Sequence, residues 1–149
     1  MALAADTQLG MSMRFMVTID KKPYDLGSWA KVSGLDVAWD LVEYRAGDGP
    51  KNERWYYPGV TKYSTVKLER AVQDADTKKV REWLEKNSFN HEVTSGTVEL
   101  RDAKSEPVMT WILRHVLPVK WSISPFDATA NKVAVETLEV AHMGFLENE

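Results

Sequence analysis

The 149-residue chain contains no cysteine, which excludes disulfide bonds, thiolate metal ligands and a cysteine nucleophile together. No apolar run approaches the ~20 residues of a membrane-spanning helix, so we expect no membrane anchor. The first residues, Met1 to Asp6, lack the basic stretch and the long apolar run of a secretory signal peptide. We therefore expect a protein that folds in the reducing cytoplasm of the producing cell and does not use the general secretory route.

The chain also lacks a large excess of charge of either sign. Nineteen basic and twenty-two acidic residues leave a net charge of −3, so no electrostatic footprint of nucleic-acid or anionic-membrane binding is present. The hydrophobic share of 44% is ordinary for a globular protein. A chain of this length can bury a core but is short for two domains, so we expect a single domain over residues 1–149.

Groups that could perform chemistry are scarce and scattered. The three histidines, His91, His115 and His142, fall in different predicted elements and show no metal-ligand spacing. Asp36 and Asp40 resemble a pair of glycosidase carboxylates, but charged residues on the outer face of a strand explain them more simply. We therefore predict no catalytic, cofactor or metal site, and a protein that is not an enzyme.

Alternating apolar residues predict a mainly β protein, an antiparallel barrel or sandwich of six to eight strands. The predicted strands cover residues 13–19, 29–44, 62–70, 97–102, 107–117, 119–124 and 131–143. The last segment also carries a weak helical stripe, but its β-branched residues favour a strand. The strand over 107–117 is apolar on both faces, so either the helix or a partner should cover its second face.

One flanking α-helix is predicted over about residues 76–87. Asp76 can serve as its N-cap, and Val80, Trp83 and Leu84 share one apolar face. The opposite face is charged. It includes Lys79 and Glu85, whereas Trp83 is expected to be structural.

An extended hairpin over about residues 43–61 surrounds a strong turn signal at 46–50. It is too aromatic for a solvated loop, and a few buried aromatic and arginine side chains commonly dominate protein interfaces. Its aromatic side chains could alternatively stack on bases or sugars, although the neighbouring charges are too mixed for a nucleic-acid groove. The candidate contact residues are Tyr44, Arg45, Asp48, Lys51, Arg54, Trp55, Tyr56 and Tyr57.

The order of the motifs resembles the inner-tube proteins of contractile phage tails and extracellular contractile injection systems, over nearly the whole chain. The resemblance is carried by Phe15-x-Val17-x-Ile19-Asp20, Trp29-Ala30-x-Val32-Ser33-Gly34-Leu35, Glu43-Tyr44-Arg45-x-Gly47, Pro58-Gly59-x-x-Lys62-Tyr63, Val66-x-Leu68-x-Arg70, Gly96-x-Val98-Glu99-Leu100-x-Asp102, Pro107-Val108-x-x-Trp111 and Asn131-x-Val133-Ala134-x-Glu136-Thr137-Leu138-Glu139-x-Ala141-His142. In fold, this family is similar to the haemolysin-coregulated tube protein of type VI secretion.

The resemblance implies a structural subunit that closes into hexameric rings, which stack into a tube with a central lumen. Contraction of a surrounding sheath then drives the tube through a target envelope, as part of a virion or a released phage tail-like particle. The implied partners are copies of the chain itself, a sheath protein, baseplate hub and cap proteins, and cargo in the lumen, with no cofactor. The hairpin is then a candidate for the joint between rings. The charged face of the helix, with Lys79 and Glu85, is then a candidate for contact with the sheath. The alternative is a small β-barrel or sandwich that binds a ligand or glycan.

Overall fold

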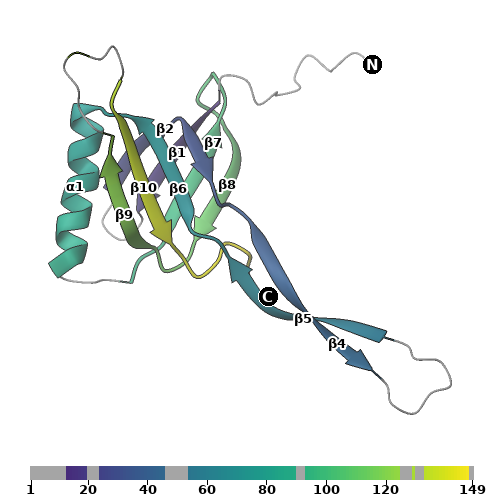
Figure 1. The fold of residues 1–149 in the computed structure, drawn as a ribbon. Coiled ribbons are helices and arrows are strands. Elements are labelled where there is room, and N and C mark those ends of the chain that lie inside the picture. Colours follow the sequence, from purple (N-terminus) through teal and green to yellow (C-terminus); the bar gives the residue numbers. More distant parts are fainter. Residues whose placement is uncertain are drawn as a thin grey trace, which may run out of the picture.

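The structure, a computed structural model, describes residues 13–19, 24–45, 54–89, 93–124, 129 and 133–147. This part of the chain forms ten strands and one helix, arranged as two four-stranded sheets and a separate two-stranded hairpin (Figure 1). Every strand pair is antiparallel. The predicted fold class is confirmed, and its body is a sandwich whose described strands do not close into a barrel.

The first sheet has the strand order β2-β1-β7-β8. Its strands are β1 (Arg14–Ile19), β2 (Tyr24–Trp29), β7 (Gly96–Arg101) and β8 (Pro107–Leu113). As the alternation in β1 predicted, Val17 and Ile19 are buried and Phe15 packs against the core beside them. The sequence did not predict β2, because its Gly27 interrupts the apolar pattern.

The second sheet has the order β3-β6-β10-β9. Its strands are β3 (Lys31–Ser33), β6 (Val66–Ala71), β9 (Leu117–Ile123) and β10 (Val135–Ala141). The last segment is therefore a strand, as predicted, and its inward residues Leu138 and Val140 oppose Val66 and Leu68 of β6. The chain passes directly from the first sheet to the second at Ala30, whose N–H donates to the Glu69 carbonyl at 3.0 Å.

The helix α1 (Asp74–Phe89) packs on β2 beside the sandwich (Figure 1). It is longer than predicted and begins before Asp76, so the prediction that Asp76 is the N-cap is wrong. The first turn is instead fixed by Gln73 and Thr77: the Thr77 N–H donates to the Gln73 carbonyl at 2.9 Å, and the Gln73 N–H donates to the Thr77 hydroxyl at 3.3 Å. The predicted apolar face is confirmed, since Val80 and Trp83 are buried.

The strand predicted over 29–44 is divided in the structure. Trp29 ends β2, β3 follows, and Gly34 then bends the chain out of the sheet with a φ of +88°. A Cβ atom on Gly34 would lie 2.0 Å from the Thr65 carbonyl oxygen. Only glycine tolerates this conformation and this close approach together, so the departure of the following strand from the body depends on it.

We expect Gly34→Ala to lower the free energy of unfolding by about 1–3 kcal/mol from backbone strain, with the steric clash adding to this cost. Urea unfolding measures the change. The neighbouring exposed residue supplies the control: Ser33→Ala should leave the midpoint unchanged. A Gly34→Ala protein as stable as Ser33→Ala would show that the bend relaxes freely.

The two-faced apolar strand β8 is an edge of the first sheet, and α1 does not cover it. Val108 and Ile112 on its outer face remain exposed, as does Met109 near its beginning. Of the two covers predicted for this strand, the helix is therefore ruled out. The other sheet ends in β9, so among the described strands both sheets have an open edge on the side away from the Ala30 crossover.

Candidate assembly surface

A long two-stranded ribbon, here called the arm, runs away from the sandwich (Figure 1). It consists of β4 (Val37–Arg45) and β5 (Arg54–Tyr63). The pairing runs from Val37 opposite Tyr63 to Arg45 opposite Arg54, and its register shifts between Trp39 and Leu41. The arm therefore begins six residues earlier than the hairpin predicted from Glu43, at the point where Gly34 has turned the chain outward.

The arm carries a concentration of exposed apolar side chains. Eight large ones are between 49% and 70% exposed: Trp39, Leu41, Val42, Tyr44, Trp55, Tyr56, Tyr57 and Val60. Single exposed hydrophobic residues are normal on protein surfaces, but a contiguous group of this kind marks an interaction site. A ribbon of only two strands is also marginally stable by itself.

Both faces of the arm are apolar. Because side chains alternate along a strand, Tyr44 and its partner Trp55 lie on one face and Tyr56 lies on the other. Each face also carries one ion pair: Asp40 Oδ2 lies 2.9 Å from Lys62 Nζ, and Glu43 Oε1 lies 3.3 Å from Arg54 Nε. Both ion pairs are exposed, and each pairs a charge of β4 with one of β5. The exposed aromatic side chains on the two faces are therefore free to contact a partner on either side.

The structure brings most of the predicted contact residues together on the arm. Those it places there are Tyr44, Arg54, Trp55, Tyr56 and Tyr57. The backbone of Arg45 belongs to β4, while its side chain, Asp48 and Lys51 lie outside the described residues. The grouping is thus seen in the structure, and the assignment to a particular interface stays a prediction.

Sequence reasoning missed the apolar residues of the arm nearer the body. Trp39 and Leu41 fall in the strand predicted over residues 29–44 and precede the hairpin predicted from Glu43, so they are not among the predicted contact residues. A signal was available: Leu41 and Val42 are consecutive, so both faces of this strand carry aliphatic side chains. A strand that is apolar on both faces needs covering on both.

The root of the arm is held by the C-terminal segment, residues 142–147. Tyr63, the last residue of β5, makes edge-on ring contacts with His142 at 5.5 Å and with Phe145 at 5.2 Å between centroids. Gly144 lies beneath the Tyr63 ring, where a Cβ atom would come within 2.6 Å of it. His142, Gly144 and Phe145 therefore pack against Tyr63 and attach the base of the arm to the body.

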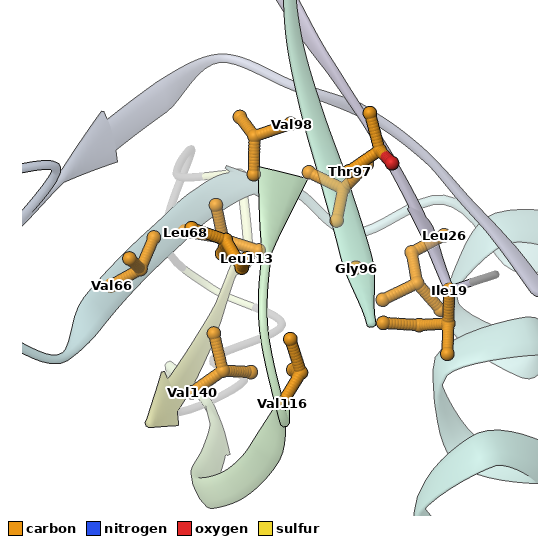
Figure 2. A pocket seen from close by; sticks show the side chains of 11 residues that line it. Ile19, Leu26, Val66, Leu68, Gly96, Thr97, Val98, Leu113, Val116 and Val140 are labelled. Carbon is orange, nitrogen blue, oxygen red and sulfur yellow. The ribbon is translucent and has the colours of Figure 1, made fainter. Parts of the chain in front are cut away.

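The cavity that the described residues enclose between the two sheets is too small for a ligand. This cavity is lined by apolar side chains, among them Ile19, Leu68, Leu113 and Val140 (Figure 2), and its volume is about 10 Å³. This volume is at the lower limit for one water molecule. Within the described residues no group of three or more histidine, aspartate or glutamate side chains could hold a metal ion, and His91 lies outside them.

A sequence model of the family described as T4-like virus tail tube protein gp19 matches residues 11–146. The chain belongs to this family. The search of curated proteins returned no match. The match spans both sheets, the arm and the helix, so the tail tube family accounts for the whole described architecture. The members are structural tube proteins, which is consistent with a chain that is not an enzyme.

Two solved structures support the tail tube assignment, and a third shares the fold. The chain is 26% identical to a protein in the PVC sheath-tube complex of an extracellular contractile injection system in its extended state, with a TM-score of 0.70 and coverage of 91% of this chain and 88% of that one. It is 27% identical to one in the PVC sheath/tube terminator, with a TM-score of 0.70 and coverage of 93% and 95%. A protein in the baseplate of the anti-feeding prophage shares the fold at 21% identity, with a TM-score of 0.70 and coverage of 95% of each chain. These comparisons give no support to the alternative of a ligand- or glycan-binding module.

In this tail tube protein the helix has two distinct faces. Trp83 is 3% exposed and belongs to the core, as predicted, whereas Lys79 and Glu85 are exposed. Glu85 Oε1 accepts a hydrogen bond from Arg81 Nε at 3.0 Å one turn away. No helix in the described part of the chain is long and apolar enough to cross a bilayer.

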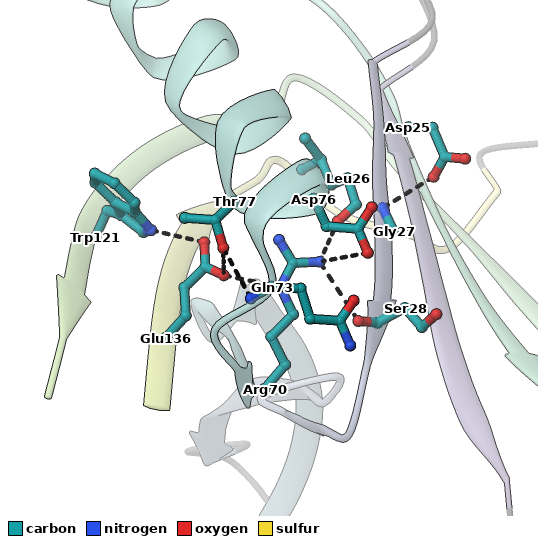
Figure 3. Close-up of polar contacts among 10 residues, drawn as sticks. All are labelled: Asp25, Leu26, Gly27, Ser28, Arg70, Gln73, Asp76, Thr77, Trp121 and Glu136. Carbon is teal, nitrogen blue, oxygen red and sulfur yellow. Dashed lines mark hydrogen bonds and ion pairs between the residues drawn. The ribbon is translucent and has the colours of Figure 1, made fainter. Parts of the chain in front are cut away.

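A buried polar network ties this helix to both sheets (Figure 3). Arg70 of β6 donates from Nε to Glu136 Oε2 of β10 at 2.8 Å, and Nη1 donates to the Leu26 carbonyl of β2. Glu136 also accepts from the Thr77 hydroxyl of α1 at 3.0 Å and from the Trp121 indole N–H of β9 at 2.9 Å. Two charged side chains thus connect four strands of the sandwich, β2, β6, β9 and β10, and the helix to one another.

Proposed function

We propose that the chain assembles with copies of itself into stacked rings that form the inner tube of a contractile tail or injection particle, and that the arm makes the joint between rings. The observation that carries this proposal is the exposed aromatic arm. A side chain such as Trp55 or Tyr57 supplies a large apolar area and two rotatable side-chain angles, so it anchors an interface at small entropic cost.

The energetics favour a repeated contact. Truncating a central aromatic anchor of an interface commonly costs about 2 kcal/mol or more, and each ~1.4 kcal/mol changes an equilibrium constant tenfold. In stacked rings every subunit makes the same contact at once, so the loss is multiplied around the ring. A small defect in one arm residue is therefore expected to have a large effect on tube growth.

Within a ring, the open edges supply the second contact. Edge strands present unpaired N–H and C=O groups and are templates for pairing with another chain. The edges formed by β8 and β9 lie on one side of the sandwich, and β8 also exposes Val108 and Ile112. We infer that neighbouring subunits join their sheets there, around a central lumen.

The similar solved structures come from a sheath-tube complex, a sheath/tube terminator and a baseplate. By analogy with them, the partners we propose are a sheath protein outside the tube and baseplate hub and cap proteins at its two ends. The exposed charged face of α1, with Lys79 and Glu85, is the candidate for contact with the sheath. The function is structural, with no catalytic step and no cofactor.

Polar substitution on either face of the arm is expected to stop tube growth. Tyr56→Ser changes one face and Tyr57→Ser the other, and neither side chain contributes to the core, so the midpoint of thermal unfolding should not fall. Negative-stain electron microscopy and light scattering should then show subunits or single rings in place of long tubes.

The matched control is Val93→Ser, which removes a similarly exposed apolar side chain from a site outside the arm. It should assemble like the wild type. Tubes that grow at the wild-type rate from both arm variants would contradict the assignment of the arm to the joint. Featureless monomers from the wild-type protein itself would contradict the tube.

A further inference from the structure

His142 makes two hydrogen bonds that connect the root of the arm to the C-terminal segment. Its Nε2 lies 3.0 Å from the carbonyl oxygen of Ser64, the first residue after β5. Its Nδ1 lies 3.1 Å from the backbone nitrogen of Gly144. The ring also contacts Tyr63, so one side chain joins the end of the arm to the segment that packs against it.

These two partners fix the protonation state of the ring. The Ser64 carbonyl can only accept, so Nε2 must carry a hydrogen; the Gly144 N–H can only donate, so Nδ1 must be bare. Both bonds therefore form together only with a neutral imidazole in its Nε2–H tautomer. A proton on Nδ1 would remove the acceptor of the Gly144 N–H.

The surroundings of Gly144 leave it little freedom to adjust if its N–H loses this acceptor. It is buried, it has a φ of +129°, and Tyr63 and Arg114 both lie against it. Its carbonyl accepts from the Arg114 N–H at 2.9 Å, and the Met143 N–H donates to the Arg114 carbonyl at 2.8 Å. The segment is thus held between the β8–β9 turn on one side and the root of the arm on the other.

Burial and one neighbouring positive charge favour the neutral form of His142. Burial lowers the pKa of His142 below the ordinary 6.5, and the positive charge of Arg114 on the β8–β9 turn lowers it further, against a raising effect of the Ser64 hydrogen bond. The carboxylate of Glu139 on β10 accepts from the Thr65 hydroxyl at 2.7 Å. Glu147 lies at the far end of the same segment, lining a groove with Arg114.

We propose that His142 is an acid-sensitive latch: its neutral ring holds the root of the arm on the body, and a proton taken up at Nδ1 releases Gly144 and loosens that root. When the segment is released, Phe145 moves away from the Tyr63 ring. The arm is then no longer held in one direction relative to the sandwich. The consequence for tubes, which rests on the proposed function of the arm, is that acid weakens the joint between rings.

The direction of the pH dependence follows from the difference between the pKa values of His142 in the closed and opened states. The folded state has the lower pKa, so between that value and the ordinary 6.5 the opened state binds the proton and the closed state does not. The stabilisation by the latch is complete above about pH 6.5 and is lost as the pH falls toward the folded value. Between the two pKa values, the opening equilibrium should increase about tenfold for each pH unit of acidification.

Amide hydrogen exchange read by mass spectrometry tests the latch on the full chain. Peptides covering residues 60–65 and 142–147 are compared with a peptide covering 135–141, between about pH 7.5 and about pH 5.5, with intrinsic exchange rates divided out. In the wild type the first two should lose protection relative to the third on acidification. His142→Gln retains a donor for the Ser64 carbonyl and cannot be protonated, so its relative protection should not change with pH.

Arg114→Gln provides a second variant. Removing the neighbouring positive charge should raise the folded pKa of His142 toward the ordinary 6.5 and so make the loss of protection on acidification smaller, while the backbone bonds of residue 114 remain. The latch is overturned if wild-type protection does not change with pH, or if His142→Gln loses protection as the wild type does. Should His142→Gln fail to fold, an Arg114→Gln protein that loses as much protection as the wild type on acidification overturns it instead. Exchange is measured on subunits whether or not they form tubes, so a failure of the tube proposal remains distinguishable.

Discussion

Replacing Arg70 by methionine is expected to lower the free energy of unfolding by about 3–5 kcal/mol, the usual cost of breaking a buried ion pair by removing one partner. The side chains of Arg70 and Glu136 are 3% and 0% exposed, so a remaining Glu136 carboxylate would be left without its counter-charge. Asp76 also lies 4.0 Å from Arg70 and would lose the same partner. The guanidinium stacks 3.9 Å from the centre of the Trp29 ring as well.

A double-mutant cycle separates the ion pair from the packing around it. Urea unfolding of Arg70→Met, Glu136→Leu and the double variant should show that the double change costs less than the sum of the single ones, because it leaves no isolated charge. We expect a coupling of about 0.5–3 kcal/mol, the range for residues that share a network. Additive single effects would show that the pair contributes only as separate hydrogen-bonding groups.

The positions of Arg70 and Glu136 could have been suspected from the sequence, although their contact could not. Arg70 follows Val66 and Leu68 at the spacing of two that points to the interior, and Glu136 precedes Leu138 in the same way. A charged residue at a buried position needs a partner. Which strand supplies that partner depends on the order β6-β10, and alternation within single strands does not encode strand order.

The arm shows a different limit of sequence reasoning. Alternation predicts that one side of a strand is covered, without identifying what covers it. For β6 and β10 the cover is the same chain, so the predicted core is confirmed. For Trp39 and Leu41 the same pattern is found on an exposed ribbon that the described part of the chain does not cover, and the proposed function assigns that cover to another copy of the chain. The aromatic run Trp55-Tyr56-Tyr57 belongs to the hairpin that was predicted to be extended because it is long and aromatic, and all three side chains are exposed.

The predicted ends of the helix and strands are wrong where a single local interaction decides where the element begins or ends. The helix begins at Asp74 because Gln73 and Thr77 satisfy the first turn, and an acidic residue at position 76 suggested a later start. The strands β2 and β3 are separate because the chain changes sheets at Ala30, a crossover that no residue type marks. These errors moved elements by a few residues or divided them, and left the fold class unchanged.

We expect Trp83→Ala to lower the stability of the folded subunit before it affects assembly. Trp83 and Val80 are the buried residues of an otherwise charged helix, so α1 is held on the sandwich by a narrow stripe. Truncating a buried tryptophan typically costs about 3–5 kcal/mol, out of the ~5–15 kcal/mol that stabilises a domain. The thermal midpoint and the soluble yield should both fall.

Lys79→Ala and Glu85→Ala are the matched controls on the exposed face of the same helix. Lys79 is exposed, and the exposed Arg81–Glu85 pair contributes only about 0.3–0.5 kcal/mol. Both should therefore melt close to the wild type. A Trp83→Ala protein that also melts like the wild type would show that the stripe does not hold the helix. If the charge variants build normal tubes that no longer bind a sheath protein, then the polar face of α1 is a docking surface and its apolar face is the structural support, so that one helix divides the two roles between its sides.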